Sequence, residues 1–239
     1  MRAAVFIDGA YLQKQFQLAK VEADYPKVAD YLLAPVRKNV SIDLLRCYFY
    51  HCPPWMSSKQ TDDEKRRMAV HQEFCQRLEE LNRWQIRLGK LERRRDGERE
   101  YFEQKRLDVL LSCDLVRHAA AGHIQHAILV AGDSDFIPAV TAAKESGVTL
   151  TLWCGAENTV HRDLKMLADE VQVFKWRSFP KKDSKSTSTT SKKTKTSATT
   201  KSSKATKKSN KKNYKKNSRR SSTTNKRVIK KKFKPKKTS

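Results

Sequence analysis

The chain alternates between short apolar runs and longer segments in which apolar residues recur every three or four positions. The apolar runs end in turn residues and predict buried strands, and the periodic segments predict helices with one buried face. The predicted strands are 2–7, 44–50, 127–131, 148–153 and 171–176, and the predicted helices are 11–20, 62–81, 107–121, 136–146 and 158–168. Strand and helix alternate through the second half, which is typical of a mainly parallel sheet covered on both faces. We therefore expect a three-layer α/β/α, Rossmann-like domain.

Two segments interrupt this alternation. Pro26 and Pro35 lie between the first predicted helix and the second strand, and because proline lacks a backbone N–H we expect an irregular connection there. Asp96-Gly97 is a turn pair typical of β-hairpins, and it lies between two short segments that predict hairpin strands, 86–91 and 99–104.

Net charge divides the chain into two parts. Of the 51 Lys and Arg residues, 24 follow Pro180, where Asp183 is the only acidic residue, so this tail carries +23 (24 − 1) of the net +25. Residues 1–180 carry the remaining +2 and are long enough for one domain with a full core. Residues 181–239 contain little besides Lys, Ser, Thr and Asn, and they cannot bury enough apolar surface to offset the entropy of ordering. We expect this tail to be disordered.

The basic tail is expected to bind nucleic-acid phosphates without reading their sequence. Only Tyr214 and Phe233 are available in it for stacking on bases. The alternatives are a solubilising tail, a segment that binds anionic membranes and, in a cell with a nucleus, a localisation signal. The lysines expected to contact phosphate are Lys207, Lys208, Lys211, Lys212, Lys230, Lys231 and Lys232.

Cysteine usage and hydropathy indicate the compartment. The five cysteines are odd in number and form no Cys-x-x-Cys pair, which favours reduced thiols over a disulfide framework. No stretch approaches the roughly 18 apolar residues of a membrane span, and the amino terminus enters a strand without the layout of a signal peptide. We expect a soluble cytoplasmic protein, or a nuclear one in a cell with a nucleus.

Four aspartates lie where predicted strands end or predicted helices begin. Asp8 follows the first strand, Asp133 and Asp135 follow strand 127–131, and Asp108 begins a helix. The carboxyl ends of parallel strands share one edge of a sheet, so these side chains are expected to converge. Close carboxylates repel one another unless a hard cation neutralises them, and Mg²⁺ or Mn²⁺ prefers such oxygen ligands. The pattern predicts a metal-dependent phosphodiesterase. The alternative roles are a helix cap for Asp133, or Ser134, and favourable first-turn positions at a helix N-terminus for Asp108 and Asp135.

Other polar residues of the second half are weaker candidates. Asp114 lies six residues after Asp108, about 240° around the helix, so spacing alone does not place the two on one face. It is interpreted as an outer metal ligand or a surface charge. The spacing of His118, His123 and His126 around the end of one helix does not form a ligand pair, so we expect them to face solvent or to interact with the helix end rather than bind zinc.

The predicted hairpin is rich in basic residues. Arg93, Arg94, Arg95 and Arg99 bracket its turn, and Lys105 follows its second strand. A basic hairpin tip is suited to contact a nucleic-acid backbone. The alternative is a charged strand edge that prevents pairing with other sheets.

Three motifs together resemble the NYN-domain family, whose LabA-like members belong to the PIN-like nuclease superfamily. They are Phe-Ile-Asp-Gly at 6–9, Lys-x-x-Asp-Val at 105–109 with an aspartate six residues later, and Gly-Asp-Ser-Asp-Phe at 132–136 followed by Pro138 and Gly147. The resemblance covers residues 1 to about 176. It implies a PIN-like α/β/α fold and a metal-dependent ribonuclease. The acidic positions of the family fall on Asp8, Asp108, Asp133 and Asp135, with Asp114 as a further one.

The chain departs from the family pattern at one position. The family often has Asn three residues after its first Asp, and this chain has Tyr11. Our first hypothesis is an endoribonuclease that uses Mg²⁺ or Mn²⁺ to activate a water, with a tail that tethers RNA. The intact acidic positions favour it. A non-catalytic RNA-binding protein, which Tyr11 leaves open, and a nuclease that acts on DNA are the alternatives.

Overall fold

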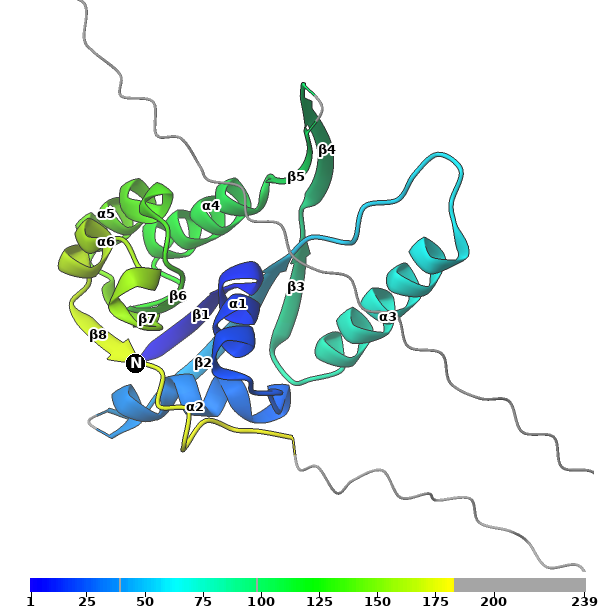
Figure 1. Ribbon diagram of the computed structural model, residues 1–239. Helices are drawn as coiled ribbons and strands as arrows, with labels where there is room; N and C mark the ends of the chain where they lie inside the picture. The colour runs from blue at the N-terminus through cyan, green and yellow to red at the C-terminus, as the bar shows by residue number, and fades with distance from the viewer. Residues whose placement is uncertain (39, 98, 183–239) are drawn as a thin grey trace, which may run out of the picture. The chain divides into compact units, whose positions relative to one another are not determined.

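The computed structural model describes residues 1–38, 40–97 and 99–182, and they contain a six-stranded sheet (Figure 1). All neighbouring strands are parallel, in the order β3-β2-β1-β6-β7-β8. The mainly parallel sheet expected from the sequence is confirmed. The strands are β1 (Arg2–Asp8), β2 (Asp43–His51), β3 (Trp84–Leu88), β6 (His126–Val130), β7 (Thr149–Cys154) and β8 (Glu170–Val173).

The central strand β1 packs its side chains alternately into two apolar layers, as the two-residue period of a strand requires. Val5 and Ile7 lie in the same buried cluster as Leu12, whereas Phe6 lies in the opposite cluster with Leu111. The three layers are therefore confirmed. On the first face are α1 (Gly9–Ala19), α2 (Tyr25–Arg37) and α3 (Asp62–Glu79), and on the second are α4 (Leu107–Ala120), α5 (Ile137–Glu145) and α6 (Arg162–Leu167) (Figure 1).

The irregular connection expected around Pro26 and Pro35 is wrong, because this segment forms α2. Pro26 lies in the first turn, where the missing N–H has no partner within the helix in any case. Pro35 lies near the end, so only the last turn loses a bond. Apolar residues recur through the helix and are buried, and this burial outweighs the cost of the prolines. The buried residues are Val28, Ala29, Leu32, Leu33 and Val36.

The hairpin around Asp96-Gly97 exists, but its first strand is not the predicted 86–91. The chain divides at Gly89: β3 joins the main sheet beside β2, and β4 (Lys90–Asp96) pairs antiparallel with β5 (Arg99–Lys105) in a separate two-stranded sheet. A side chain at position 89 would place its Cβ 2.7 Å from the Lys105 carbonyl oxygen. Glycine therefore allows the chain to leave the main sheet here, and the hairpin extends beyond the strand ends (Figure 1).

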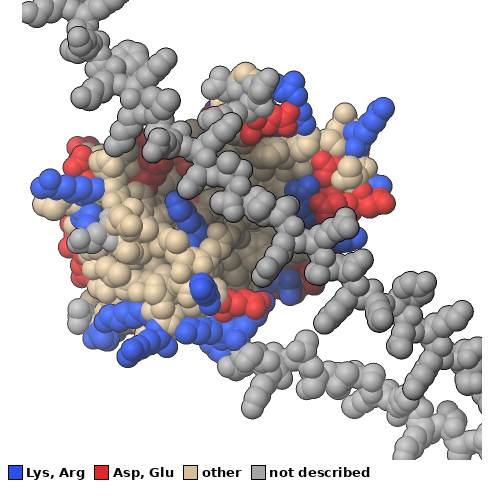
Figure 2. All heavy atoms as spheres, viewed as in Figure 1, with Lys and Arg blue, Asp and Glu red and all other residues tan. Residues whose placement is uncertain are grey.

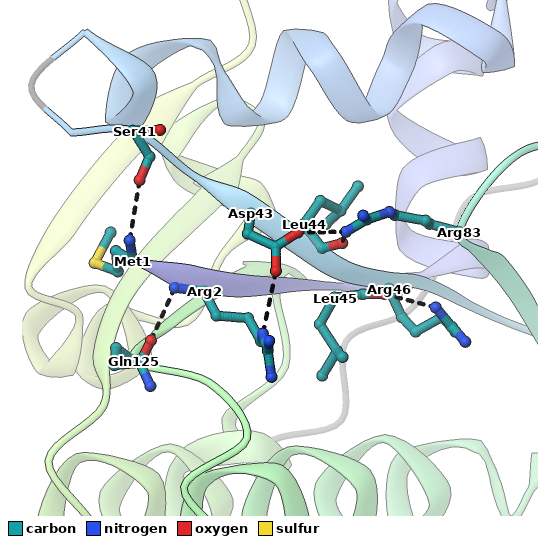
Figure 3. A network of polar contacts seen from close by, with 9 residues as sticks. All are labelled: Met1, Arg2, Ser41, Asp43, Leu44, Leu45, Arg46, Arg83 and Gln125. Atoms are coloured by element: carbon teal, nitrogen blue, oxygen red, sulfur yellow. Dashed lines mark hydrogen bonds and ion pairs between the residues drawn. The ribbon is translucent and has the colours of Figure 1, made fainter.

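The amino ends of the central strands are joined by polar contacts (Figure 3). The terminal ammonium group of Met1 donates to the Ser41 carbonyl at 3.0 Å. Asp43 accepts from Arg2 at 3.2 Å and from Arg83 at 2.6 Å. These contacts hold β1, β2 and β3 together at this edge. The polar residues at the opposite, carboxyl edge are the ones that the sequence associates with chemistry.

The segment after β8 returns to the connection between α1 and α2. Phe179 is buried in the first cluster, and the Asp24 N–H donates to the Pro180 carbonyl at 3.0 Å. Lys182 pairs with Glu22 at 2.6 Å. These contacts continue two residues past the predicted domain boundary at 180. The tail lysines singled out from the sequence, from Lys207 to Lys232, lie outside the described residues.

Two further properties bear on the sequence predictions. All five cysteines are free, and Cys113 is the exposed one. None of the helices in the described part of the chain combines the length and apolar character that a membrane span requires.

Candidate active site

Asp8 is the last residue of β1 and also caps α1. Its Oδ1 accepts the N–H groups of Ala10 at 3.0 Å and Tyr11 at 3.1 Å, so Oδ2 is left for another partner. Burial raises the pKa of Asp8 to about 6, and the negative charges of Asp108 and Asp133 add to the rise, while the two backbone N–H groups oppose it. A nearby cation would stabilise the ionised form of such a carboxylate.

Asp133 and Asp135 follow β6 across a turn that only glycine fits. A Cβ at Gly132 would lie 2.4 Å from the Thr159 carbonyl oxygen and 2.4 Å from the Tyr11 ring. Asp133 Oδ1 accepts the Asp135 N–H at 3.2 Å and so caps a short 3₁₀ helix, η1 (Ser134–Phe136). The capping role considered from the sequence is thus present at Asp133. It uses Oδ1 and leaves Oδ2 without a backbone N–H donor.

Asp108 lies in the first turn of α4, directly after the hairpin. The chain turns between β5 and α4 through Arg106, which has a left-handed φ of 77°. Burial raises the pKa of Asp108, and the charges of Asp133 and Asp135 add to the rise. Asp8 responds to Asp108 and Asp133 in the same way. Carboxylates from three parts of the chain thus affect the charge of Asp8 and of Asp108; we call Asp8, Asp108, Asp133 and Asp135 the acidic cluster.

A cavity of about 550 Å³ opens beside the acidic cluster. Asp8 and Asp133 line it, whereas Asp135 lines a separate hollow with Arg117 and Pro138. Asp108 is not among the residues that line either of these two. The other wall of the cavity comes from α1 and from the segment after β7, and it includes Tyr11, Lys14, Asn158, Thr159 and His161.

Tyr11 links the two segments that form this wall. Its hydroxyl accepts the Gly155 N–H at 3.0 Å and lies 3.2 Å from Thr159 Oγ1. The ring therefore ties α1 to the connection between β7 and α6. At the position where the family often has Asn, this chain has a residue whose polar group is already engaged in holding the cavity wall.

Lys14 and His161 are the candidate residues that the sequence did not reveal. His161 caps α6, since its Nδ1 accepts the Asp163 N–H at 3.3 Å. A neutral imidazole that accepts at Nδ1 carries its proton on Nε2, so this nitrogen is a donor. Lys14 is exposed and forms no ion pair within the described residues. The position of His161 after a parallel strand is the signal that could have identified it. The helix predicted over 158–168 placed His161 inside a helix, whereas α6 begins one residue after it.

Asp114 belongs to a different network. It is buried, and its two oxygens accept from the Tyr50 hydroxyl at 3.0 Å, Arg87 Nε at 3.0 Å and an Arg117 nitrogen at 2.9 Å. These donors occupy both oxygens of the carboxylate. Asp114 is not among the charges that raise the pKa of Asp8 or Asp108. The structure gives Asp114 a structural role and does not place it with the acidic cluster.

The expectation that the three histidines face solvent or interact with the helix end is wrong for His126, whereas His118 lies in the last turn of α4. His118 is buried and lies 2.8 Å from the Tyr48 hydroxyl and 3.2 Å from His123. His126 is buried in β6, where its two ring nitrogens lie 2.7 and 3.0 Å from the hydroxyls of Thr149 and Thr151. Partners for the ring nitrogens make burial possible, because a buried polar group without one is costly.

The acidic cluster has suitable donors for Mg²⁺ or Mn²⁺, which prefer carboxylate oxygens. Within the described residues, no three His, Cys, Asp or Glu side chains are arranged to coordinate one ion. The carboxylates would thus have to turn toward a bound ion. Neutralising their mutual repulsion favours this rearrangement, so the chemistry of the donors fits the ion although the present side-chain positions are more open.

Three of the hairpin arginines, Arg93, Arg94 and Arg95, are paired within the hairpin itself. Arg93 and Arg95 both contact Glu100, at 2.7 and 2.6 Å, and Arg94 contacts Glu103 at 3.2 Å. Lys105 also pairs with Glu103. Basic and acidic side chains are seen next to one another on the hairpin in Figure 2. The proposed phosphate contacts of these residues, and of Arg99, stay predictions, and the ion pairs reduce the charge available for them.

Comparisons with known proteins identify a family. The model of the NYN domain matches residues 2–175. A search of curated proteins found no match. Among solved structures, a protein of unknown function from Vibrio parahaemolyticus RIMD 2210633 is similar, with 15% sequence identity and a TM-score of 0.47 over 72% of this chain and 92% of that chain.

Proposed function

The chain belongs to the NYN-domain family, which consists of PIN-like nuclease domains, and we propose that it is a metal-dependent endoribonuclease. The observation that carries the proposal is the acidic cluster. Asp8, Asp108 and Asp133 come from separate elements; the charges of Asp108 and Asp133 help to raise the pKa of Asp8, and the charge of Asp133 helps to raise that of Asp108. Carboxylates with pKa values raised in this way are typical of functional sites, where a cation or a reaction makes use of them.

The acidic cluster would hold Mg²⁺ or Mn²⁺, which would supply an activated water and neutralise charge on the phosphate. The residues of the opposite wall have complementary properties. Lys14 offers a cation and His161 an N–H donor on the other side of the same cavity. We assign them to the phosphate oxygens of the bound strand, with Tyr11 holding the wall in place.

The basic tail is proposed to increase the affinity for RNA through phosphate contacts that do not depend on sequence. The tail carries 24 of the 51 basic residues. The tail would contribute to RNA binding and not to cleavage, because all four residues of the acidic cluster precede it in the sequence. DNA is the second substrate to consider, since a carboxylate site does not itself recognise the 2′-hydroxyl.

A non-catalytic RNA-binding protein is the second candidate function. Two observations favour it: Tyr11 replaces the Asn that is frequent in the family, and no three carboxylates in the described residues are positioned around one ion. This protein would keep the fold and the RNA contacts and would cleave slowly or not at all.

Cleavage of labelled single-stranded RNA separates these functions. The full chain should cleave RNA with Mn²⁺ and stop in EDTA, and Asp133→Asn should lose the activity. Asp62→Asn is the matched control, because it removes one carboxylate from α3 where the side chain is 94% exposed. Matched DNA identifies the substrate. RNA that is bound with and without Mn²⁺ and never cleaved would establish the non-catalytic alternative.

A further inference from the structure

The hairpin presents aromatic side chains to solvent. Phe102 is 53% exposed and its neighbour Tyr101 is 50% exposed. Successive residues of a strand point to opposite faces, so the two rings lie on different sides of the hairpin. The hairpin forms a sheet of its own, so these rings are not covered by the six-stranded sheet.

Trp55 joins Phe102 on one of these faces. It comes from the segment between β2 and α3, and its ring centroid lies 5.8 Å from that of Phe102. Arg93, which is opposite Phe102 in the strand register, places its guanidinium carbon 5.2 Å from the Trp55 ring centre. We call Trp55, Phe102 and Arg93 the aromatic platform. The other face carries Tyr101 opposite Arg94.

The charge of the hairpin favours stacking over phosphate contact. Arg93, Arg94 and Arg95 pair with Glu92, Glu100 and Glu103, so a phosphate would compete with carboxylates already in place. Within the described residues, the rings face no carboxylate competitor, and the Arg93 guanidinium packs on the Trp55 ring rather than opposing a base. Every base has a face that can stack on an aromatic ring, so this surface would bind bases without selecting a sequence.

The platform is connected directly to the acidic cluster. Strand β5 ends at Lys105, and Asp108 follows three residues later in the first turn of α4. Strands rise about 3.3 Å per residue, so Phe102 lies on the order of 10 Å along β5 from its end. An RNA strand with one phosphate at the acidic cluster would reach the aromatic platform within a few nucleotides.

From this arrangement we infer that the aromatic platform binds unpaired bases of single-stranded RNA on one side of the cleaved bond. Bases within a duplex stack on one another and present only their edges, so they do not fit a flat ring surface. The inference rests on the proposed function, since RNA is taken as the polymer. Binding can nevertheless be measured without cleavage, and this separates the failure of one from the failure of the other.

The test compares two equally exposed rings on opposite faces of the hairpin. Full-length Phe102→Ala and Trp55→Ala proteins should bind a labelled single-stranded RNA about five- to a hundredfold more weakly in EDTA, as expected for the loss of one stacked base. The measurement is made at raised salt, which suppresses the contribution of the tail. Tyr101→Ala is the matched control and should bind as wild type does. Trp55→Phe, which keeps a ring, should retain most of the affinity.

Duplex RNA and thermal unfolding complete the test. Phe102→Leu keeps an apolar side chain without the ring, and it should have the wild-type melting temperature and still bind single strands weakly. Binding of duplex RNA should be the same in all variants. Equal losses for Phe102→Ala and Tyr101→Ala, equal losses on duplex RNA, or no loss in any variant would overturn the inference. A platform effect on binding in a protein that never cleaves would retain it and reject the ribonuclease.

Discussion

Replacing Asp8 with asparagine should make the metal-free protein more stable at neutral pH, although Asp8 belongs to the proposed site. Asp8 is half-buried and lies near the charges of Asp108 and Asp133. Asparagine has nearly the same volume, and its amide oxygen can still accept the N–H groups of Ala10 and Tyr11. The substitution therefore removes the charge and keeps the cap of α1.

The size of the effect follows from the pKa of Asp8, which rises from 3.8 to about 6 on folding. Each pKa unit corresponds to about 1.4 kcal/mol, so ionised Asp8 destabilises the folded protein by about 3 kcal/mol. A raised pKa contributes stability that is fully present below the unfolded value and is lost as the pH rises through the folded value. The two proteins should therefore be similarly stable near pH 4. We expect Asp8→Asn to be more stable by about 1–3 kcal/mol above pH 7, the lower figure allowing for a buried amide N–H without a partner.

Urea unfolding in EDTA at a series of pH values measures this difference. Asp43→Asn is the control for the sign. Asp43 lies at the opposite, exposed edge of the sheet, and hydrogen bonds from Arg83 and Arg2 lower its pKa. Its replacement should therefore destabilise the protein at neutral pH and have little effect at low pH.

An Asp8→Asn protein that is less stable than wild type at neutral pH in EDTA would refute the reasoning, as would a difference that does not change with pH. Added Mn²⁺ gives a second check. An ion that binds only the folded state stabilises it, so Mn²⁺ should raise the stability of wild type more than that of Asp8→Asn.

Three further predictions concern His161, Asp114 and the basic tail. His161→Asn keeps a cap for α6 and removes the imidazole, so RNA cleavage should fall at least about tenfold while the melting temperature is unchanged; kcat and thermal unfolding measure the two effects. Asp114→Asn weakens a buried network that includes Tyr50, so it should lower stability by about 1–3 kcal/mol in urea unfolding and leave the Mn²⁺ dependence of cleavage unchanged. Truncation after Lys182 should flatten the dependence of RNA affinity on salt, measured by binding at several salt concentrations, without unfolding the domain or changing cleavage at saturating RNA; equal slopes would assign the phosphate contacts to the domain.

Residue periodicity was sufficient to predict the layers of the fold and the location of its acidic residues. The apolar run that ends at Asp8 and the run that precedes Asp133 both form central strands. Since parallel strands end at one edge, the convergence of these carboxylates could be inferred from the order of elements alone. Local sequence also predicted the hairpin turn, because glycine readily adopts the left-handed φ that a tight hairpin turn requires, and Gly97 has a φ of 58°.

The errors arose where tertiary contacts decide the structure. The prolines of α2 were given more weight than the burial of Val28 and Leu32. The start of β4 depends on a close approach between Gly89 and Lys105, and nothing local indicates it. Lys14 and His161 line the same wall of the cavity beside the acidic cluster. They are distant in the sequence, so only the folded domain places them on one wall.

The central claim is that the acidic cluster binds a catalytic divalent cation, and anomalous scattering from crystals soaked in Mn²⁺ tests it most directly. The account predicts an Mn²⁺ peak in contact with the carboxylates of Asp8 and Asp133 and with at least one of Asp108 and Asp135. The peak should be absent from Asp133→Asn crystals. An ion bound at Asp114, or no ion at the cluster in a protein that cleaves RNA in the same Mn²⁺ buffer, would contradict the account.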